Sequence, residues 1–255
     1  MPALSPASAI RANLERVATL RAQAALAGEH EAVTTIKHLQ ARRFEATYAD
    51  FAAVPASRPA VRFFLEELYG EHDFSRRDEQ FGRIAGALER LFPAAVAQLA
   101  VDLTETHALT EVLDHALARA WLGMAADMRP SERYVRAWRA AGDRSDRDRQ
   151  LTVVQHMGRE LQRLTRMRSL RMGLRMMRKP AQAAGLDALQ HFLESGFDAF
   201  AALGDAQAFL ASIAQRERQW IDLLFDAPLE EACRALDKEW QSARSPDPGN
   251  PTMPT

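Results

Sequence analysis

Apolar residues recur every three or four positions along almost the whole chain, and this spacing limits the fold more than any other feature of the sequence. In an α-helix that spacing gathers side chains on one face, whereas a half-buried strand needs strict alternation of apolar and polar residues. Alanine and leucine dominate, while valine and isoleucine, which favour strands, are sparse. The sequence therefore predicts an all-α protein without a solenoid repeat.

Prolines, glycines and charge runs divide this pattern into about nine helices, which we expect to form a compact multi-helix bundle. A short helix is expected between Pro130 and Gly142. The other helices are expected at about 8–27, 29–51, 59–70, 75–92, 93–126, 150–178, 181–203, 205–225 and 228–241.

Chain length and loop composition indicate one domain with a flexible end. A chain of 255 residues with 47% hydrophobic content can bury roughly 70% of the surface that it exposes when unfolded. We expect a single helical domain over 1–243, with a candidate boundary between two lobes near 141–150, where Gly142 precedes a run of alternating charges. The proline-rich stretch 244–255 is expected to be disordered.

Charge and cysteine content exclude several classes of protein. The net charge of −1 provides no overall attraction to nucleic acid or membranes, although the chain is arginine-rich, with only three lysines. Charged residues interrupt the N-terminal helix, and no apolar run is long enough to span a bilayer. The single cysteine, Cys233, excludes an internal disulfide and fits a reducing compartment. We therefore expect a soluble, cytoplasmic protein.

The densest aromatic stretch lies at 59–70 and is expected to form a central helix. On a helix that begins at Pro59, Val61, Phe64 and Leu65 share one face and Phe63 points to the other. A helix that is apolar on two sides packs between neighbours. The spacing of Ser75 and Asp78 predicts a capping box at the start of the following helix.

Within this stretch the chain reads FFLEELY, formed by Phe63, Phe64, Leu65, Glu66, Glu67, Leu68 and Tyr69. In these seven residues it resembles a group of bacterial proteins that are named for the FFLEELY motif. The group has no assigned activity, cofactor or catalytic residue, so the resemblance implies no function for any position of this chain.

A first candidate site lies on the long helix at 93–126. His107 and Glu111, and likewise Glu111 and His115, are four residues apart and share a face. Asp114 falls on the apolar stripe of the same helix, where a carboxylate must be paired or hydrogen-bonded. We expect an internal polar network in which Asp114 meets an arginine such as Arg62.

The alternative for these four residues is a metal, haem or other cofactor site inside the bundle. Carboxylate-bridged di-iron bundles use Glu-x-x-His twice, and this chain contains neither Glu-x-x-His nor His-x-x-x-His. No cofactor is therefore favoured, and metal analysis of the purified protein distinguishes the two interpretations.

A second candidate site is the basic stretch 159–179, expected to form one amphipathic helix. From Met167 onward one face carries methionines and leucines, and the adjacent face carries Arg168, Arg171, Arg175 and Arg178. Such a helix suits a protein partner, an anionic membrane surface or, less well, nucleic acid, because no aromatic residue lies in the stretch for base stacking. The alternative is a core-facing apolar stripe with a solvated, neutralised basic face.

Three further groups favour structure over chemistry. Glu66 and Glu67 are adjacent and diverge by about 100° on a helix, so they cannot face one substrate together. Tyr69 and His72 lie near a helix end, where capping is the simpler role. Cys233 falls beside an apolar stripe of the last helix and is expected to be a buried structural thiol.

These patterns favour a non-catalytic binding or scaffold protein that engages a protein partner or an anionic surface through 159–179. The competing hypothesis is a helical-bundle enzyme or carrier with a cofactor near His107, Glu111, Asp114 and His115.

Overall fold

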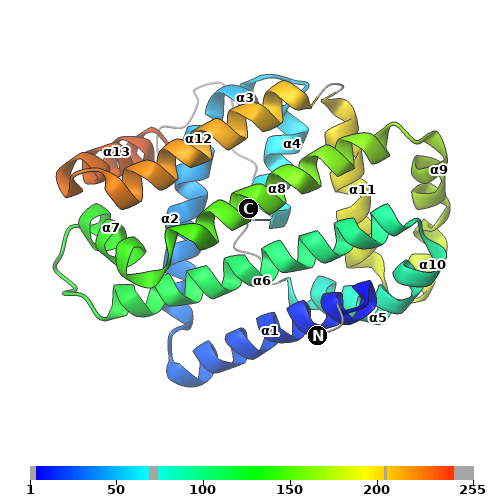
Figure 1. Cartoon of the computed structure of the whole chain (residues 1–255), viewed down its shortest axis with the longest axis horizontal. Coiled ribbons are helices and arrows are strands. Elements are labelled where there is room, and N and C mark those ends of the chain that lie inside the picture. Colours follow the sequence, from blue (N-terminus) through cyan, green and yellow to red (C-terminus); the bar gives the residue numbers. More distant parts are fainter. Residues whose placement is uncertain (1–3, 69–73, 204–205, 244–255) are drawn as a thin grey trace, which may run out of the picture.

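The computed structural model describes residues 4–68, 74–203 and 206–243, and this part of the chain contains helices and no strands (Figure 1). Thirteen α-helices and one π-helical turn form it. In order they are α1 (Pro6–Ala27), α2 (His30–Thr47), α3 (Ala49–Ala53), α4 (Arg58–Phe63), the π-helical turn η1 (Phe64–Leu68), α5 (Ser75–Leu91), α6 (Ala94–Leu122), α7 (Pro130–Ala141), α8 (Arg144–Thr165), α9 (Arg168–Met176), α10 (Arg178–Ala183), α11 (Asp187–Ala202), α12 (Gln207–Asp226) and α13 (Leu229–Ser242).

The helices form two crossing layers. Helices α1, α6, α8 and α12 lie side by side in that order, and α2, α4 and α11 cross them steeply on one face (Figure 1). At one end, α7 and α13 pack against α2, α6 and α12 around the largest hydrophobic core cluster, which includes Leu117, Tyr134 and Leu236. At the other end, α1, α5, α6 and α11 enclose a second cluster around Phe63 and Phe81. The stretch 141–150, suggested as a boundary between two lobes, contains the end of α7 and the start of α8.

The all-α prediction is confirmed, and the count of about nine helices is too low. The expected helix at 29–51 breaks at Tyr48, the one at 150–178 breaks at Met167, and the one at 181–203 breaks before Asp187. Gly185, with a φ of 65°, marks the last of these breaks. No glycine or proline lies next to Tyr48 or Met167, so the sequence gives no local signal for these two breaks.

Local chemistry explains several helix ends. Ser5 accepts a hydrogen bond from the backbone N–H of Ser8, Pro6 occupies the first turn, and Gly28 ends α1 in the left-handed conformation. The capping box predicted for Ser75 and Asp78 is wrong: Phe74 precedes the first turn of α5 and no side chain caps it. Asp78 points instead to other helices.

The aromatic segment is packed on two sides, as its pattern predicts. Phe63 contacts Phe192 of α11 at a ring-centroid distance of 5.4 Å. A Cβ added to Gly196 would lie 2.8 Å from the Phe63 ring, so only glycine permits this approach. Val61, Phe64 and Leu65 pack in a different core cluster, with Phe209 and Ile213. The side chain of Leu68, and the predicted positions Tyr69, Gly70 and His72, lie outside the described residues, as does the predicted tail at 244–255.

Gly82 and Gly86 of α5 have no close backbone of a neighbouring helix among the described residues. Only the side chains of Leu14, Arg11 and Arg90 come within 4 Å of a Cβ added there. At Gly158 of α8, by contrast, such a Cβ would lie 2.3 Å from Leu210 of α12, so these two helices approach each other closely.

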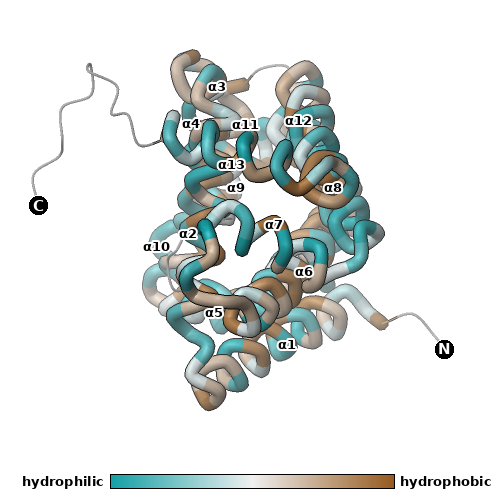
Figure 2. The backbone as a smooth tube through the Cα atoms, turned by 90° about the vertical axis from the view of Figure 1, so that its left-hand side faces the viewer, coloured by the Kyte–Doolittle hydropathy of each residue, from teal (hydrophilic) through white to brown (hydrophobic). Residues whose placement is uncertain are grey.

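Hydrophobic and hydrophilic residues alternate along the helices that face the viewer in Figure 2, as expected for amphipathic helices around shared cores. Within the described part of the chain, no helix combines the length and the apolar character needed to cross a bilayer.

Candidate functional site

Glu111 of α6 is the centre of a buried polar network. Its Oε1 lies 2.9 Å from Nη2 of Arg21 on α1 and 2.8 Å from Nζ of Lys37 on α2. His115 Nε2 lies 3.4 Å from Oε2 of Glu111, but the geometry is not that of a regular hydrogen bond. Burial opposes ionisation of Glu111, but His115 and the two cations outweigh it and hold the pKa of this carboxyl well below its ordinary value.

Asp78 of α5 extends the same network. Its Oδ2 lies 2.9 Å from Nε2 of His107 and 3.1 Å from Nη1 of Arg21, and its Oδ1 lies 3.3 Å from Nη2 of Arg77. Burial opposes ionisation, and His107, Arg77 and Arg21 together lower the pKa of the Asp78 carboxyl below its ordinary value. Arg21 therefore joins α1 to both α5 and α6 through charged hydrogen bonds.

Asp114 belongs to a different environment from Glu111. Its Oδ1 accepts a hydrogen bond from Nε2 of Gln40 at 2.8 Å, and burial raises the pKa of the carboxyl. The expected pairing with Arg62 is wrong, because Arg62 is exposed and the cations that act on Asp114 are Lys37 and Arg147.

The structure does not bring His107, Glu111, Asp114 and His115 together around one point. His107 bonds to Asp78, Glu111 and His115 face each other, and Asp114 bonds to Gln40. Among the described residues, no group of three or more His, Cys, Asp and Glu side chains is arranged to hold a metal ion. The cations around Glu111 would also repel a metal. The internal network that the sequence indicated is present, with partners from α1, α2 and α5.

The basic stretch forms three segments rather than the single helix predicted. Helix α8 ends at Thr165, Met167 is extended, and α9 and α10 follow. The break turns α9 back toward α11, where the half-buried Leu170 and Leu174 face the protein and the Gln190 amide donates a hydrogen bond to the Leu174 carbonyl at 2.7 Å.

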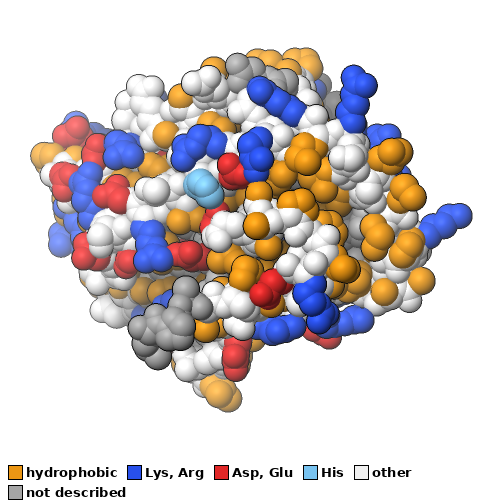
Figure 3. Space-filling view, turned by 45° about the vertical axis from the view of Figure 1, so that its right-hand side comes forward, with side chains coloured by type: hydrophobic (Ala, Val, Ile, Leu, Met, Phe, Trp, Pro, Cys, Tyr) orange, Lys and Arg blue, Asp and Glu red, His pale blue; other side chains and the backbone are white. Residues whose placement is uncertain are grey.

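No residue of α9 is buried, so its apolar face is not part of a core. Met172 and Met176 are 62% and 72% exposed, and Met167 and Met177 are 41% and 47% exposed. We call the exposed side chains on α9 and the start of α10 the Met/Arg surface: Met167, Arg168, Arg171, Met172, Arg175, Met176, Met177, Arg178 and Lys179. Figure 3 shows hydrophobic side chains and lysines or arginines intermixed on this side of the molecule.

Acids of α11 neutralise only part of this surface. Arg171 pairs with Asp198 at 2.9 Å and Arg178 pairs with Glu194 at 2.7 Å. Arg168, Arg175 and Lys179 form no ion pair within the described residues. The surface therefore carries an excess of positive charge beside exposed methionines.

The remaining predicted groups have structural surroundings. Glu66 is exposed, and Glu67 lies 3.7 Å from His191 through its carboxylate while its carbonyl accepts a hydrogen bond from Arg77. Cys233 is fully buried, and burial raises the pKa of its thiol, as expected for a structural cysteine.

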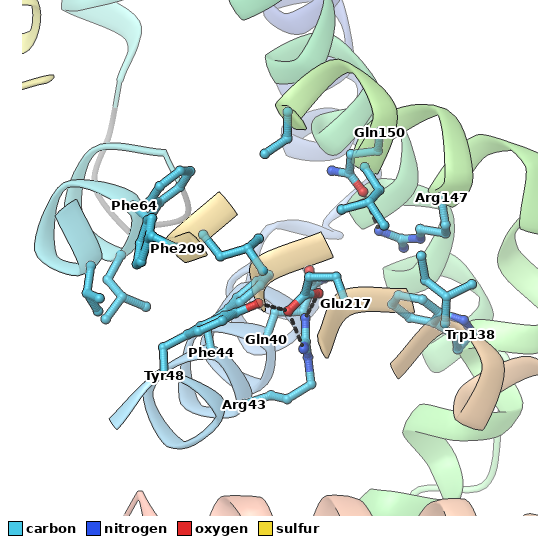
Figure 4. Close-up of a pocket in the computed structure, with 16 residues that line it drawn as sticks. Gln40, Arg43, Phe44, Tyr48, Phe64, Trp138, Arg147, Gln150, Phe209 and Glu217 are labelled. Atoms are coloured by element: carbon cyan, nitrogen blue, oxygen red, sulfur yellow. Dashed lines mark hydrogen bonds and ion pairs between the residues drawn. The ribbon is translucent and has the colours of Figure 1, made fainter. Parts of the chain in front are cut away.

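A half-enclosed cavity between α2, α4, η1, α7, α8 and α12 was not predicted. It contains about 800 Å³ of space not occupied by atoms, including solvent at its mouth. Its charged residues Arg43, Arg147 and Glu217 come from three helices (Figure 4). Arg43 and Glu217 are 174 residues apart, so no local pattern in the sequence links them.

Comparisons with known proteins assign no activity to these features. No curated protein and no solved structure matches the chain. These comparisons do not test the resemblance of residues 63–69 to FFLEELY-motif proteins, which stays a prediction. A family model described as a domain of unknown function, DUF8198, matches residues 19–231, which span most of the helices described above. The chain therefore belongs to the DUF8198 family.

Proposed function

We propose that the protein is a non-catalytic binding protein that docks an acidic segment of a partner protein on the Met/Arg surface. One observation carries this proposal: α9 holds four apolar side chains between Leu170 and Met176 and none of them is buried. A surface segment that leaves methionines exposed beside arginines has the composition of an interaction site.

The positive charge of this segment favours a negatively charged partner. Between Leu161 and Leu186 the chain has seven lysines and arginines and no acid, although the whole chain has a net charge of −1. The acids supplied by α11 offset two of these cations, Arg171 and Arg178. An anionic partner would neutralise the remaining cations. Attraction to their charge would also raise the rate of association.

The residue types favour protein over membrane or nucleic acid. Guanidinium groups match the two oxygens of a carboxylate, and flexible methionines adapt to irregular apolar side chains. Helices that insert into membranes present bulky Trp, Phe or Leu outward, whereas Leu170 and Leu174 face the protein. The stretch 159–179 has no aromatic residue on which bases would stack. A cytoplasmic location is part of this proposal.

Fluorescence anisotropy with a labelled peptide of alternating Glu and Leu tests the proposal at roughly 50 mM and 300 mM salt. The wild-type protein should bind the peptide more weakly at the higher salt concentration. The charge-reversed variant R168E/R171E/R175E should lose binding.

The matched control is R62E/R90E/R218E, which reverses three exposed arginines that form no ion pair in the described residues. This control has the same net charge as the surface variant and should retain binding. Equal binding by the two variants would overturn the proposal. Binding of phosphatidylserine vesicles in place of the peptide would assign the Met/Arg surface to membranes and also overturn it.

A further inference from the structure

Met172 and Met176 are the most exposed methionines in the described part of the chain, at 62% and 72%. They lie four residues apart on α9, so they share one face of that helix. Met157 of α8 is only 8% exposed, and Met124 packs against the largest core cluster. A thioether in contact with solvent is open to oxidation, whereas a buried one is shielded. An oxidant in solution should therefore reach α9 before it reaches the core.

The neighbours of Met172 along the helix are cations. Arg168 lies four residues before it and Arg175 lies three residues after it, and side chains at these spacings are adjacent on a helix. Neither arginine forms an ion pair with another described residue, and α9 itself contains no acid. Both guanidinium groups therefore have N–H donors available for an acceptor at position 172.

A thioether and a sulfoxide at this position would act differently on the two arginines. The thioether of Met172 is apolar and a weak acceptor, so it leaves both guanidinium groups to a partner. A sulfoxide is polar, and its oxygen accepts hydrogen bonds from a charged donor. Oxidation of Met172 would therefore remove apolar contact area and also supply an acceptor that competes with the carboxylates of a partner for Arg168 and Arg175.

We propose that Met172 is a site of reversible oxidation by peroxide that switches off binding at the Met/Arg surface. Because it regulates the same surface, this switch depends on the proposed function. The thioether sulfur attacks one oxygen of hydrogen peroxide, an S–O bond forms and the O–O bond breaks. The sulfur loses two electrons, and the proton of the transferred oxygen passes to the leaving hydroxide to give water. A methionine sulfoxide reductase reverses the step, with two thiols oxidised to a disulfide and the oxygen released as water.

The exposure of Met172 separates the switch from the stability of the fold. No residue of α9 is buried, and a change on an exposed side chain alters stability little. Leu170 and Leu174, which face the protein, cannot be oxidised in this way, and the Gln190 amide still holds the Leu174 carbonyl. Oxidation should therefore change binding without unfolding the protein.

Fluorescence anisotropy with the labelled Glu/Leu peptide measures the switch. The reduced full-length protein is compared with protein treated with hydrogen peroxide until peptide mass spectrometry shows the sulfoxide at Met172 and an intact Met157. The oxidised protein should bind the peptide more weakly by roughly tenfold, the loss expected when one methionine no longer contributes its apolar burial. Treatment with a methionine sulfoxide reductase and dithiothreitol should restore the affinity. The melting temperature should change by no more than about 2 °C on oxidation.

Two matched variants assign the effect to one position. Met172→Leu keeps an apolar side chain that peroxide does not oxidise, so it should bind as wild type before treatment and lose at most about threefold after treatment. Met176→Leu retains Met172 and should lose binding by roughly tenfold after treatment, as the wild type does. Equal losses in the two oxidised variants would overturn the assignment to Met172.

Failure of the switch and failure of the proposed function give different results. A reduced protein that does not bind the peptide contradicts the proposed function, and the switch with it. Equal binding before and after oxidation of Met172 overturns the switch alone and leaves the proposed function intact. A steep fall in the melting temperature of the oxidised protein would attribute the lost binding to unfolding, which also overturns the switch.

Discussion

The interior network around Glu111 and the Met/Arg surface use the same residue types in opposite ways. Inside, Arg21 and Lys37 meet the carboxylates of Glu111 and Asp78 at distances of 2.8 to 3.1 Å. On the surface, Arg168 and Arg175 lie beside exposed methionines and form no ion pair with another described residue. A buried charge must be paired to be tolerated, whereas a solvated charge remains available for a partner. The comparison separates side chains that hold the helices together from those that the protein presents to other molecules.

The largest expected effect on stability comes from the interior. Glu111→Gln removes the carboxylate that Lys37 and Arg21 share and leaves Arg21 with Asp78 alone. We therefore expect a loss of about 2–4 kcal/mol in the free energy of unfolding, measured by urea denaturation. The matched control is Glu66→Gln on an exposed side chain, with an expected change within about 0.5 kcal/mol. Equal changes in the two variants would break the distinction between interior and surface charges.

Glycine substitutions extend the same comparison to packing. Gly196→Ala brings a Cβ to 2.8 Å from the Phe63 ring and should destabilise the protein by about 1–3 kcal/mol. Gly173→Ala on α9 meets nothing within 4 Å and should stabilise by about 0.5–1 kcal/mol, because alanine is the better helix former. Thermal denaturation of both variants checks the two signs, and a stabilised Gly196→Ala would show that the contact of α4 with α11 is looser than described.

The pH dependence of stability tests the network's charge. The pKa of Glu111 in the folded protein lies below its ordinary value of 4.5, so its contribution is complete above that pH and is lost as the pH falls toward the folded pKa. Asp78, with an ordinary value of 3.8, acts in the same direction. Asp114 has the opposite effect. Its pKa is raised above the ordinary value of 3.8, so it lowers stability as the pH rises from 3.8 toward the raised pKa. Calorimetry should therefore show the melting temperature falling below about pH 4.5, and less steeply in Glu111→Gln. An identical pH dependence in the variant would assign acid unfolding to other groups.

The smallest expected effect on stability comes from the surface. Met172→Ser with Met176→Ser replaces side chains that are 62% and 72% exposed, so the free energy of unfolding should change by no more than about 0.5 kcal/mol. Binding of the acidic Glu/Leu peptide should nevertheless weaken, because the apolar part of the contact is removed. A large loss of stability would show that the methionines serve the fold.

Much of this architecture could be predicted from local patterns. The helical class follows from the apolar spacing, and Gly28, Pro93, Pro130 and Pro228 set helix boundaries that the structure confirms within a few residues. The breaks at Tyr48 and Met167 could not be predicted, because packing against other helices decides them and no local residue forces them.

The candidate sites also combine features that the sequence predicts with features that only the fold determines. The position of Glu111 on a core-facing stripe of α6 indicated a buried polar network, but its partners Arg21 and Lys37 are 90 and 74 residues away. The basic character of 159–179 was evident in the sequence, whereas the exposure of its methionines depends on how α9 turns toward α11. The cavity at Arg43, Arg147 and Glu217 left no local pattern at all, since only the fold brings these residues together.

Hydrogen exchange of the full chain, with and without the Glu/Leu peptide, tests the central claim most directly. The amides of 166–183 should become protected when the peptide is added at low salt, while those around Glu111 in α6 keep the protection that they have in the free protein. Protection elsewhere, with 166–183 unchanged, would contradict the assignment of binding to the Met/Arg surface.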